Sequence, residues 1–104
     1  MARHLLFYGL SQEADNDLGE IYDYTAESFG AEQAIKYLSG FENIFEGLCS
    51  DPESGRARDD IRNDLRSISY RSHTVFYRIL KDRIHIVRVL HGSRDVIKFL
   101  PPKD

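Results

Sequence analysis

The sequence predicts an α+β fold in which a helical hairpin packs on one face of a mostly antiparallel sheet. Two stretches whose apolar residues recur at helical spacing meet at Gly30, which is typical of two helices joined by a short turn. Two later runs rich in β-branched and aromatic residues, 74–80 and 84–90, flank a polar triplet and predict a β-hairpin. The 104 residues suffice for one small core, so we expect a single domain over residues 1–104 with the order β-α-α-β-β-β.

The N-terminal half is expected to supply one strand and both helices. The apolar run 4–10 predicts a strand that lies at a sheet edge or pairs with the last strand. Ser11 suits a helix N-cap because acidic residues follow it, and Gly30 suits a helix end that needs a positive φ. The second helix should end before Asp51-Pro52, since the residue before a proline disfavours the helical conformation.

The C-terminal half is expected to complete the sheet. Residues 51–63 predict a polar surface loop, and residues 64–70 predict a strand that turns at Arg71-Ser72 into the hairpin. Arginines interrupt the apolar hairpin runs, so we expect the core on one sheet face and a shallow, arginine-studded binding surface on the other. Residues 93–100 are too apolar for a solvated tail, so they should pack as a short helix or dock on a partner as an arm, and packing is favoured.

Charge and composition narrow the class of protein. The net charge of −3 combines residues 1–55, with 2 basic and 11 acidic side chains, and residues 56–94, with 10 basic and 4 acidic side chains. This asymmetry either follows from acidic helices and basic strands or marks a cationic face for an acidic partner. A nuclease that holds a polyanion is usually basic overall, so no direct nucleic-acid partner is expected. A single cysteine, no signal-like N-terminus and no apolar run of about 20 residues predict a cytoplasmic protein without a membrane partner.

The sequence offers no recognised catalytic motif. The four histidines are scattered without the i,i+4 spacing of a metal site on a helix, and there is no phosphate-binding glycine loop. Cys49 lies among apolar helix residues and should be a small core residue, not a nucleophile. We therefore expect no catalytic residue, no metal and no cofactor.

Arginines occur once on each of the three predicted C-terminal strands, at Arg66, Arg78 and Arg88. A three-residue hairpin loop, 81–83, would place Arg78 opposite Ile86 and on the same face as Arg88, whereas a two-residue loop would separate the two arginines. A cluster of the three could bind phosphates or carboxylates through bidentate contacts, and we favour this arrangement. In the alternative, each arginine pairs with a carboxylate of the preceding loop: Asp59, Asp60 or Asp64.

Several short motifs together resemble one family. They are Leu65-Arg66-Ser67, Ser72-His73, Phe76-Tyr77-Arg78 and Arg88-Val89-Leu90-His91. With matching positions in both helices, they resemble ParE-type toxins of the RelE/ParE superfamily over about residues 8–96. The chain departs from the family at Tyr70-Arg71, where a glycine is usual, which affects the expected turn type.

The resemblance implies a toxin of a type II toxin–antitoxin system, held inactive by a ParD-like antitoxin whose C-terminal segment wraps around it. ParE-type toxins poison DNA gyrase, whereas RelE-type toxins of the same fold cleave messenger RNA on the ribosome. Because the chain is acidic and its motifs are closer to ParE, we favour a gyrase inhibitor that is not an enzyme. A chain that only binds an antitoxin-like partner is a third possibility.

The competing ribonuclease would use histidines for proton transfer and arginines to hold the phosphate charge. The proton-transfer candidates are His85 and His91. Six residues are the candidates for contacts with the antitoxin or the target: Arg66, Arg78, Arg88, His91, Arg94 and Phe99.

Overall fold

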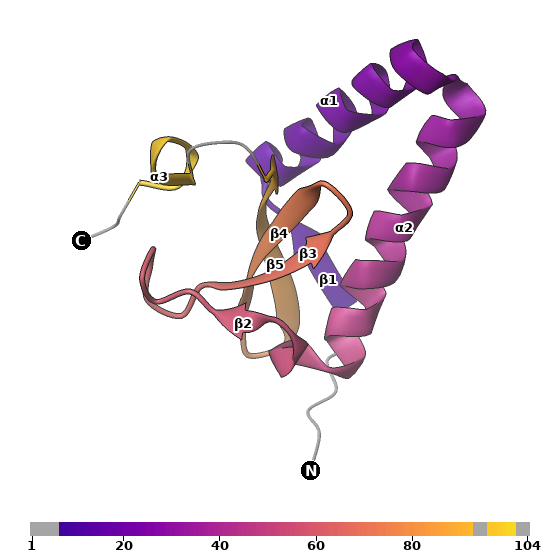
Figure 1. Cartoon of the computed structure of the whole chain (residues 1–104). Coiled ribbons are helices and arrows are strands. Elements are labelled where there is room, and N and C mark those ends of the chain that lie inside the picture. Colours follow the sequence, from indigo (N-terminus) through magenta and orange to yellow (C-terminus); the bar gives the residue numbers. More distant parts are fainter. Residues whose placement is uncertain (1–6, 93–95, 102–104) are drawn as a thin grey trace.

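The computed structural model describes residues 7–92 and 96–101. Its elements in chain order are β1 (Phe7–Leu10), α1 (Gln12–Phe29), α2 (Ala31–Ser50), the short 3-10 helix η1 (Pro52–Ser54), β2 (Arg56–Ala57), β3 (Arg66–Tyr70), β4 (His73–Ile79), β5 (Arg83–His91) and α3 (Val96–Phe99). Figure 1 shows α1 and α2 as a hairpin on one side of the sheet and α3 on the other side. The predicted α+β class and element order are confirmed, with the two-residue β2 as an additional strand.

The strands form a sheet in the order β1-β5-β4-β3-β2 within the described part of the chain. β1 is parallel to β5, and every other pair of neighbours is antiparallel. The first strand thus lies at an edge and pairs with the last strand, as predicted. Its pairing ends at Leu10 opposite Ile86, so β1 provides no hydrogen-bonding partner for the rest of β5. The edge of β5 from Val87 to His91 is therefore not paired with β1.

The two helices begin and end where the sequence predicts. The Ser11 Oγ accepts a hydrogen bond from the Ala14 N–H at 2.9 Å, which caps α1, and its O–H donates to the Val87 carbonyl at 2.7 Å. Ser11 therefore also anchors the start of the helix to β5. Gly30 has φ 93°, a left-handed value that favours glycine, and it separates α1 from α2. The tip of the hairpin projects beyond the strands (Figure 1).

The β4–β5 hairpin contains an irregularity that the sequence did not reveal. Close to the loop, Arg78 pairs with His85, so the expectation that it lies opposite Ile86 was wrong. A bulge between Phe76 and Tyr77 then shifts the register by one residue, and Arg88 pairs with Phe76. Because Phe76 and Arg78 are two residues apart on β4, Arg78 and Arg88 share a face, as predicted, although the cause is the bulge and not the loop length.

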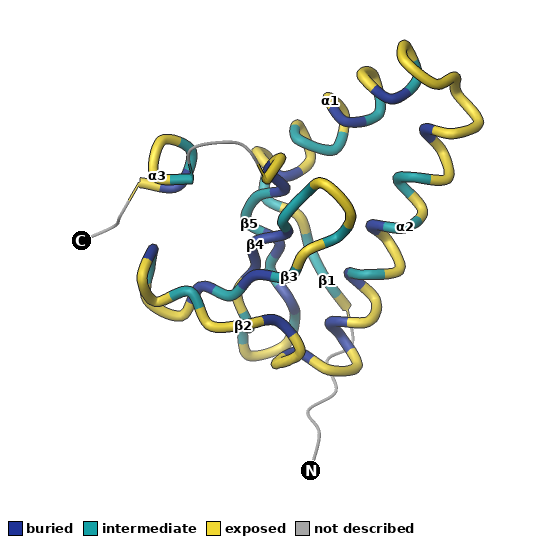
Figure 2. Tube along the Cα trace, in the orientation of Figure 1, coloured by how far each residue is buried: buried dark blue, intermediate teal, exposed yellow. Residues whose placement is uncertain are grey.

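Both faces of the sheet are covered by apolar packing. On the side of the hairpin, aromatic and aliphatic residues of α2 pack against alternate residues of the strands, and these include Phe41, Phe45, Leu48, Val75, Tyr77, Ile84 and Ile86. On the opposite side a second cluster contains Ile61, Leu65, Phe76, Leu90 and Leu100. Figure 2 shows buried positions on both the helices and the strands. The expectation of an open, arginine-studded second face was therefore wrong, because the 58–65 segment and the α3 region cover it.

The turn between β3 and β4 keeps the geometry of a glycine turn without a glycine. Arg71 has φ 52°, which lies in the left-handed region that L side chains rarely adopt. Before it, Tyr70 packs against α2 at Gly40, where an added Cβ would overlap the Tyr70 hydroxyl. Arg71 therefore occupies a backbone position that would suit glycine.

The hydroxyl of Tyr77 connects the loop after α2 to the sheet through two hydrogen bonds. It donates to the Pro52 carbonyl at 2.7 Å and accepts from the Gly55 N–H at 3.0 Å, and Tyr77 is fully buried. Tyr77→Phe leaves both backbone groups without this partner, so we expect it to lower the free energy of unfolding by about 1–3 kcal/mol. Urea denaturation measures the loss, and Tyr24→Phe, at an exposed tyrosine, is the control that should change it by less than about 0.5 kcal/mol.

Candidate functional site

The three strand arginines do not form one cluster. Arg66 pairs with Tyr77 in the β3–β4 ladder and therefore lies on the hairpin side of the sheet, opposite to Arg78 and Arg88. One Arg66 nitrogen, Nη2, donates to the carbonyls of Glu53 and Gly55. Arg66 thus fixes the segment that contains η1 against β3, and the expectation of an arginine trio was wrong.

Arg88 is held in a bidentate ion pair with Asp17 of α1. Its Nε and Nη2 donate to the two Asp17 carboxylate oxygens at 2.8 Å each, and its Nη1 donates to the Phe99 carbonyl at 3.2 Å. The hydrogen bond to Asp17 raises the pKa of Arg88. The partner is a helix carboxylate, so the alternative of a loop acid was also wrong for this arginine. The Arg88 charge is therefore neutralised inside the protein.

Asp17 also provides a hydrogen-bond acceptor for the part of β5 that β1 does not pair with. Its Oδ2 accepts a hydrogen bond from the Val89 backbone N–H at 2.9 Å, beyond the point where β1 stops pairing. The side chains of Asp17 and Arg88 are only 10% and 14% exposed. One carboxylate thus joins α1, the edge of β5 and, through Arg88, the segment after β5 that contains α3.

Arg78 is the strand arginine that faces solvent. It is exposed and forms no ion pair among the described residues. Its strand partner His85 has a pKa lowered by burial and further by the positive charges of Arg83 and Arg78. His85 is therefore neutral at neutral pH, beside an arginine that remains available for a partner.

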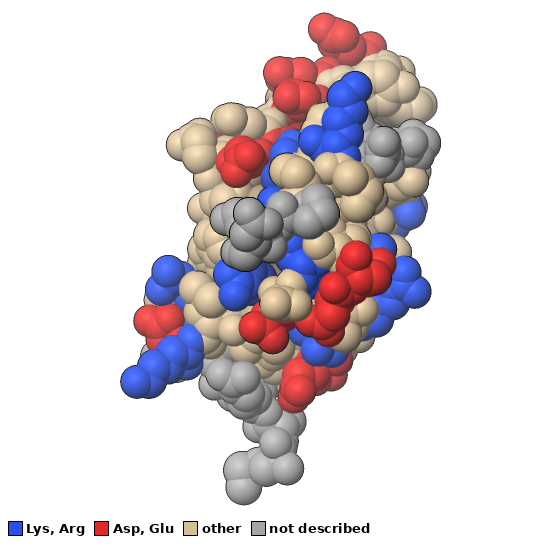
Figure 3. Space-filling view, turned by 90° about the vertical axis from the view of Figure 1, so that its left-hand side faces the viewer, with Lys and Arg blue, Asp and Glu red and all other residues tan. Residues whose placement is uncertain are grey.

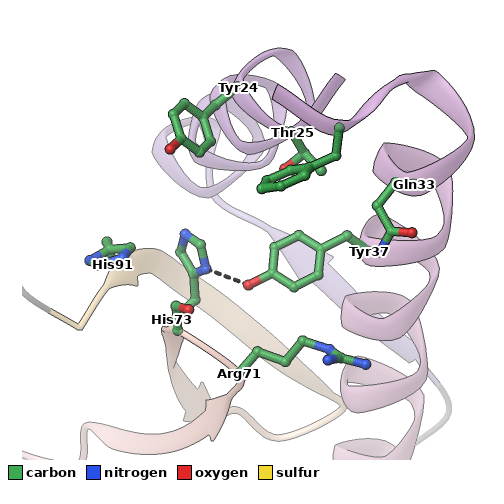
Figure 4. A pocket seen from close by; sticks show the side chains of 9 residues that line it. Tyr24, Thr25, Gln33, Tyr37, Arg71, His73 and His91 are labelled. Atoms are coloured by element: carbon green, nitrogen blue, oxygen red, sulfur yellow. Dashed lines mark hydrogen bonds between the residues drawn. The ribbon is translucent and has the colours of Figure 1, made fainter. Parts of the chain in front are cut away.

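His91 lies at the other end of β5, in a groove between the hairpin and the β3–β4 turn. The groove has a volume of about 680 Å³ and is lined by Tyr24, Thr25, Phe29, Gln33, Tyr37, Arg71, Ser72, His73 and His91. Figure 4 shows Tyr37 near its centre, with Tyr24 and Thr25 on the α1 side and Arg71 on the opposite side. The groove therefore combines aromatic surface with cationic and hydroxyl groups.

A hydrogen-bonded pair organises the interior of this groove. The Tyr37 hydroxyl lies 2.7 Å from the His73 Nδ1 (Figure 4), and the His73 and His91 rings meet edge to face at 5.3 Å between centroids. Burial is the main cause that raises the pKa of Tyr37, so its hydroxyl stays protonated at neutral pH and can donate to His73. These contacts place both histidines in one aromatic cluster that links α2 to the sheet.

The remaining predicted contact residues belong to the C-terminal segment. Arg94 lies outside the described residues. The Phe99 ring lies 5.6 Å from the Arg88 guanidinium carbon and packs on the second core. The short helix α3 and the following Leu100 therefore pack on the sheet, which confirms the favoured expectation for residues 93–100 within its described part.

The surface charge is mixed on the side of the molecule that carries α3 (Figure 3). Figure 3, the side that carries α3, shows blue and red side chains interleaved with no continuous blue face. In residues 7–92 and 96–101, no group of three or more histidine, cysteine or acidic side chains is arranged to hold a metal ion. Cys49 is buried, and burial raises the pKa of its thiol, as expected of a core residue. None of the helices in this described part is long and apolar enough to cross a membrane.

Sequence reasoning missed four residues that shape the site: Asp17, Tyr37, Arg71 and His73. The His73–His91 pair had a usable signal, because the register assumed for a three-residue loop also places His73 opposite His91. Asp17 had none, since it is one of several acids along α1 and its partner is distant in the sequence.

Comparisons with known proteins agree with this fold and these motifs. Residues 8–96 match the family model described as "ParE toxin of type II toxin-antitoxin system, parDE". Toxin ParE1 of Mycobacterium tuberculosis is 41% identical over 90 residues, which cover 86% of this chain and 92% of the relative. Toxin ParE1 of Caulobacter vibrioides is 36% identical over 86 residues, or 83% and 88% of the two chains.

A solved structure supports the fold separately. A chain of the chromosomal ParDE toxin–antitoxin system from P. aeruginosa superimposes with a TM-score of 0.73 at 20% identity, covering 86% of this chain and 97% of the other. At that identity the likeness concerns the fold alone. The family match over residues 8–96 and the two close relatives decide the identity: this chain belongs to the ParE toxin family of type II toxin–antitoxin systems.

Proposed function

We propose that the chain inhibits DNA gyrase through protein contacts, without catalysis of its own, and that a ParD-like antitoxin neutralises it. One observation carries this choice over RNA cleavage. A metal-free ribonuclease needs cations aimed at the phosphate and two groups placed for proton transfer. Among the residues that sequence reasoning assigned to RNA cleavage, Arg66 and Arg88 direct donors to backbone carbonyls and Asp17, and His85 and His91 lie near opposite ends of β5. His73 does lie beside His91, but its Nδ1 is engaged by the Tyr37 hydroxyl.

The proposed antitoxin contacts use groups that remain accessible. Arg78 is exposed. On the hairpin, the apolar residues Tyr24, Phe29 and Ile35 are 69%, 70% and 58% exposed to solvent. A partner that carries both carboxylates and apolar side chains complements this combination. Arg78 and His91 therefore stay proposed contacts, while Arg66 and Arg88 would act indirectly by holding the surface in shape. Since gyrase acts on the chromosome, the proposed place of action is the bacterial cytoplasm.

Expression in bacterial cells separates the two activities. Induced alone, the chain should stop growth with DNA-damage signalling and filamentation while protein synthesis continues, because a gyrase poison leaves broken DNA. Co-expression of a cognate ParD-type antitoxin should restore growth. The measurements are reporter induction, microscopy and incorporation of labelled amino acid. An immediate collapse of protein synthesis without DNA-damage signalling would instead favour cleavage of messenger RNA.

A further inference from the structure

The groove beside the β3–β4 turn contains a cation without a carboxylate partner. Arg71 is exposed, and it forms no ion pair among the described residues. Its Nε donates to the Tyr70 hydroxyl at 3.4 Å, and its guanidinium carbon lies 5.6 Å from the centre of the Tyr70 ring. A hydrogen bond this long to a neutral group leaves most of the donor capacity of the guanidinium unused.

The backbone at Arg71 makes this placement unusual. Its φ of 52° lies in the left-handed region, which is unfavourable for residues with a side chain and favourable for glycine. The Arg71 side chain is exposed and touches only the neighbouring Tyr70 among the contacts described above, and it is Tyr70 that packs against α2. The turn therefore presents a guanidinium at the groove at a position where glycine would suit the fold better.

The lining of the groove is complementary to an acidic segment. Among the described residues, no aspartate or glutamate lines it, although the first 55 residues hold 11 acidic side chains. The adjoining groove of about 400 Å³ shares Tyr24, Thr25, His73 and His91 and adds Asp17 and Glu20. Arg88 neutralises Asp17, so Glu20 is the acidic group that remains at that end. A carboxylate would therefore favour the Arg71 end over the Glu20 end.

The aromatic residues beside Arg71 supply apolar contact area. Tyr24 and Phe29 are about two-thirds exposed at the groove, and the half-buried Tyr37 forms part of its interior. Aromatic residues and arginine are both enriched among the residues that contribute most to protein–protein binding. The groove can thus hold an aliphatic or aromatic side chain while Arg71 holds the adjacent carboxylate.

We propose that this groove binds a segment of the antitoxin in which a carboxylate side chain lies beside an apolar one, with Arg71 as the group that binds the carboxylate. The inference rests on the proposed function only for the identity of that partner. Arginine can form two parallel hydrogen bonds to one carboxylate, which neither lysine nor a neutral residue reproduces. Arg71 would accordingly determine which antitoxin segments fit this toxin.

The test uses the full ¹⁵N-labelled chain and two blocked pentapeptides, Gly-Leu-Glu-Phe-Gly and its glutamine counterpart. We expect the glutamate peptide to bind at least tenfold more tightly in an NMR titration, with the largest shifts at Arg71, Tyr37 and His73. Arg71→Gly is the informative variant, because glycine suits the φ of 52° and removes the side chain that carries the guanidinium without straining the turn. It should reduce glutamate-peptide affinity to the glutamine-peptide level, and Lys81→Gln, exposed in the distant hairpin loop, should leave affinity unchanged.

Equal affinity of the two peptides, no saturable binding, or an Arg71→Gly variant that binds like the wild type would overturn the assignment. Thermal unfolding of the glycine variant checks that it remains folded. Light scattering measures the molar mass in solution and so tests whether a second copy of the chain occupies the groove. A wild-type dimer that becomes a monomer in Arg71→Gly would show this and contradict the proposal. If the chain inhibits gyrase but binds both peptides equally, only the assignment of the groove is contradicted. If it prefers the glutamate peptide but does not inhibit gyrase, only the proposed target is contradicted.

Discussion

Asp17→Ala is expected to lower the free energy of unfolding by about 2–4 kcal/mol, a large effect for a residue on a mostly exposed helix. The substitution leaves the Arg88 guanidinium, 14% exposed, without its carboxylate and removes the acceptor of the Val89 N–H. It also frees Arg88 from the position in which it donates to the Phe99 carbonyl, so the α3 region should loosen. Chemical denaturation measures the loss, and hydrogen exchange at Val89 should increase.

Asp23→Ala is the matched control for this prediction. Asp23 lies on the same helix, carries the same charge and is exposed, so its replacement should change stability by less than about 0.5 kcal/mol. Replacing Arg88 by methionine together with Asp17→Ala should recover part of the loss, because no buried charge then remains unpaired. A loss below about 1 kcal/mol for Asp17→Ala would show that the ion pair does not join these elements.

Leu100→Ala is expected to cost about 2–4 kcal/mol, because it opens a cavity in the second core. Leu100 is 1% exposed and packs with Ile61, Leu65, Phe76 and Leu90 on the face of the sheet away from the hairpin. Thermal or urea unfolding monitored by circular dichroism would detect the loss. The variant should also bind a hydrophobic dye more strongly, since loosening of α3 uncovers apolar surface.

Ile97→Ala provides the comparison within the same short segment. Ile97 is 53% exposed, so its truncation should change stability by less than about 1 kcal/mol. Similar small losses for both variants would mean that the C-terminal segment is a detachable arm, and the second core would then have to close without it. A large loss for Leu100→Ala alone supports a structural role for the segment after β5.

The helical hairpin was predictable because its determinants are local. Ser11 caps a helix through a bond to a residue three positions later, and Gly30 ends it through its own backbone conformation. The strands followed from runs of β-branched and aromatic residues. The hairpin loop lay close to the predicted polar triplet, but Arg83 of that triplet already belongs to β5 and pairs with Leu80. These elements required no knowledge of distant contacts.

The second core and the bulge could not be predicted because they depend on distant contacts. The β4–β5 bulge decides the faces of Arg78 and Arg88, and no residue type in the sequence marks it. The cover over Phe76 comes from residues 61, 65 and 100, which the sequence places in a loop, at the start of a strand and in the C-terminal segment. An alternating pattern tells which residues are apolar on a strand, but it does not tell what packs on them.

The candidate site was predicted in part. His91 does line a groove, and Arg78 is exposed, whereas Arg66 and Arg88 have structural partners. Arg88 illustrates the difficulty, since its carboxylate lies 71 positions away on a helix with several similar acids. Spacing along one strand cannot select among them. Arginine itself gives no sign of the positive φ at Arg71, and the one hint was the glycine that is usual in the family at Tyr70-Arg71.

Inhibition of purified DNA gyrase is the most direct test of the proposed function. Relaxed plasmid, ATP and gyrase are incubated with increasing amounts of the chain, and supercoiling and DNA cleavage are followed on gels. The account predicts that supercoiling falls, that cleaved plasmid accumulates only when gyrase is present, and that a cognate ParD-type antitoxin reverses both effects. Undiminished supercoiling at a large molar excess of the folded chain, together with cleavage of ribosome-bound messenger RNA by the same preparation, would contradict it.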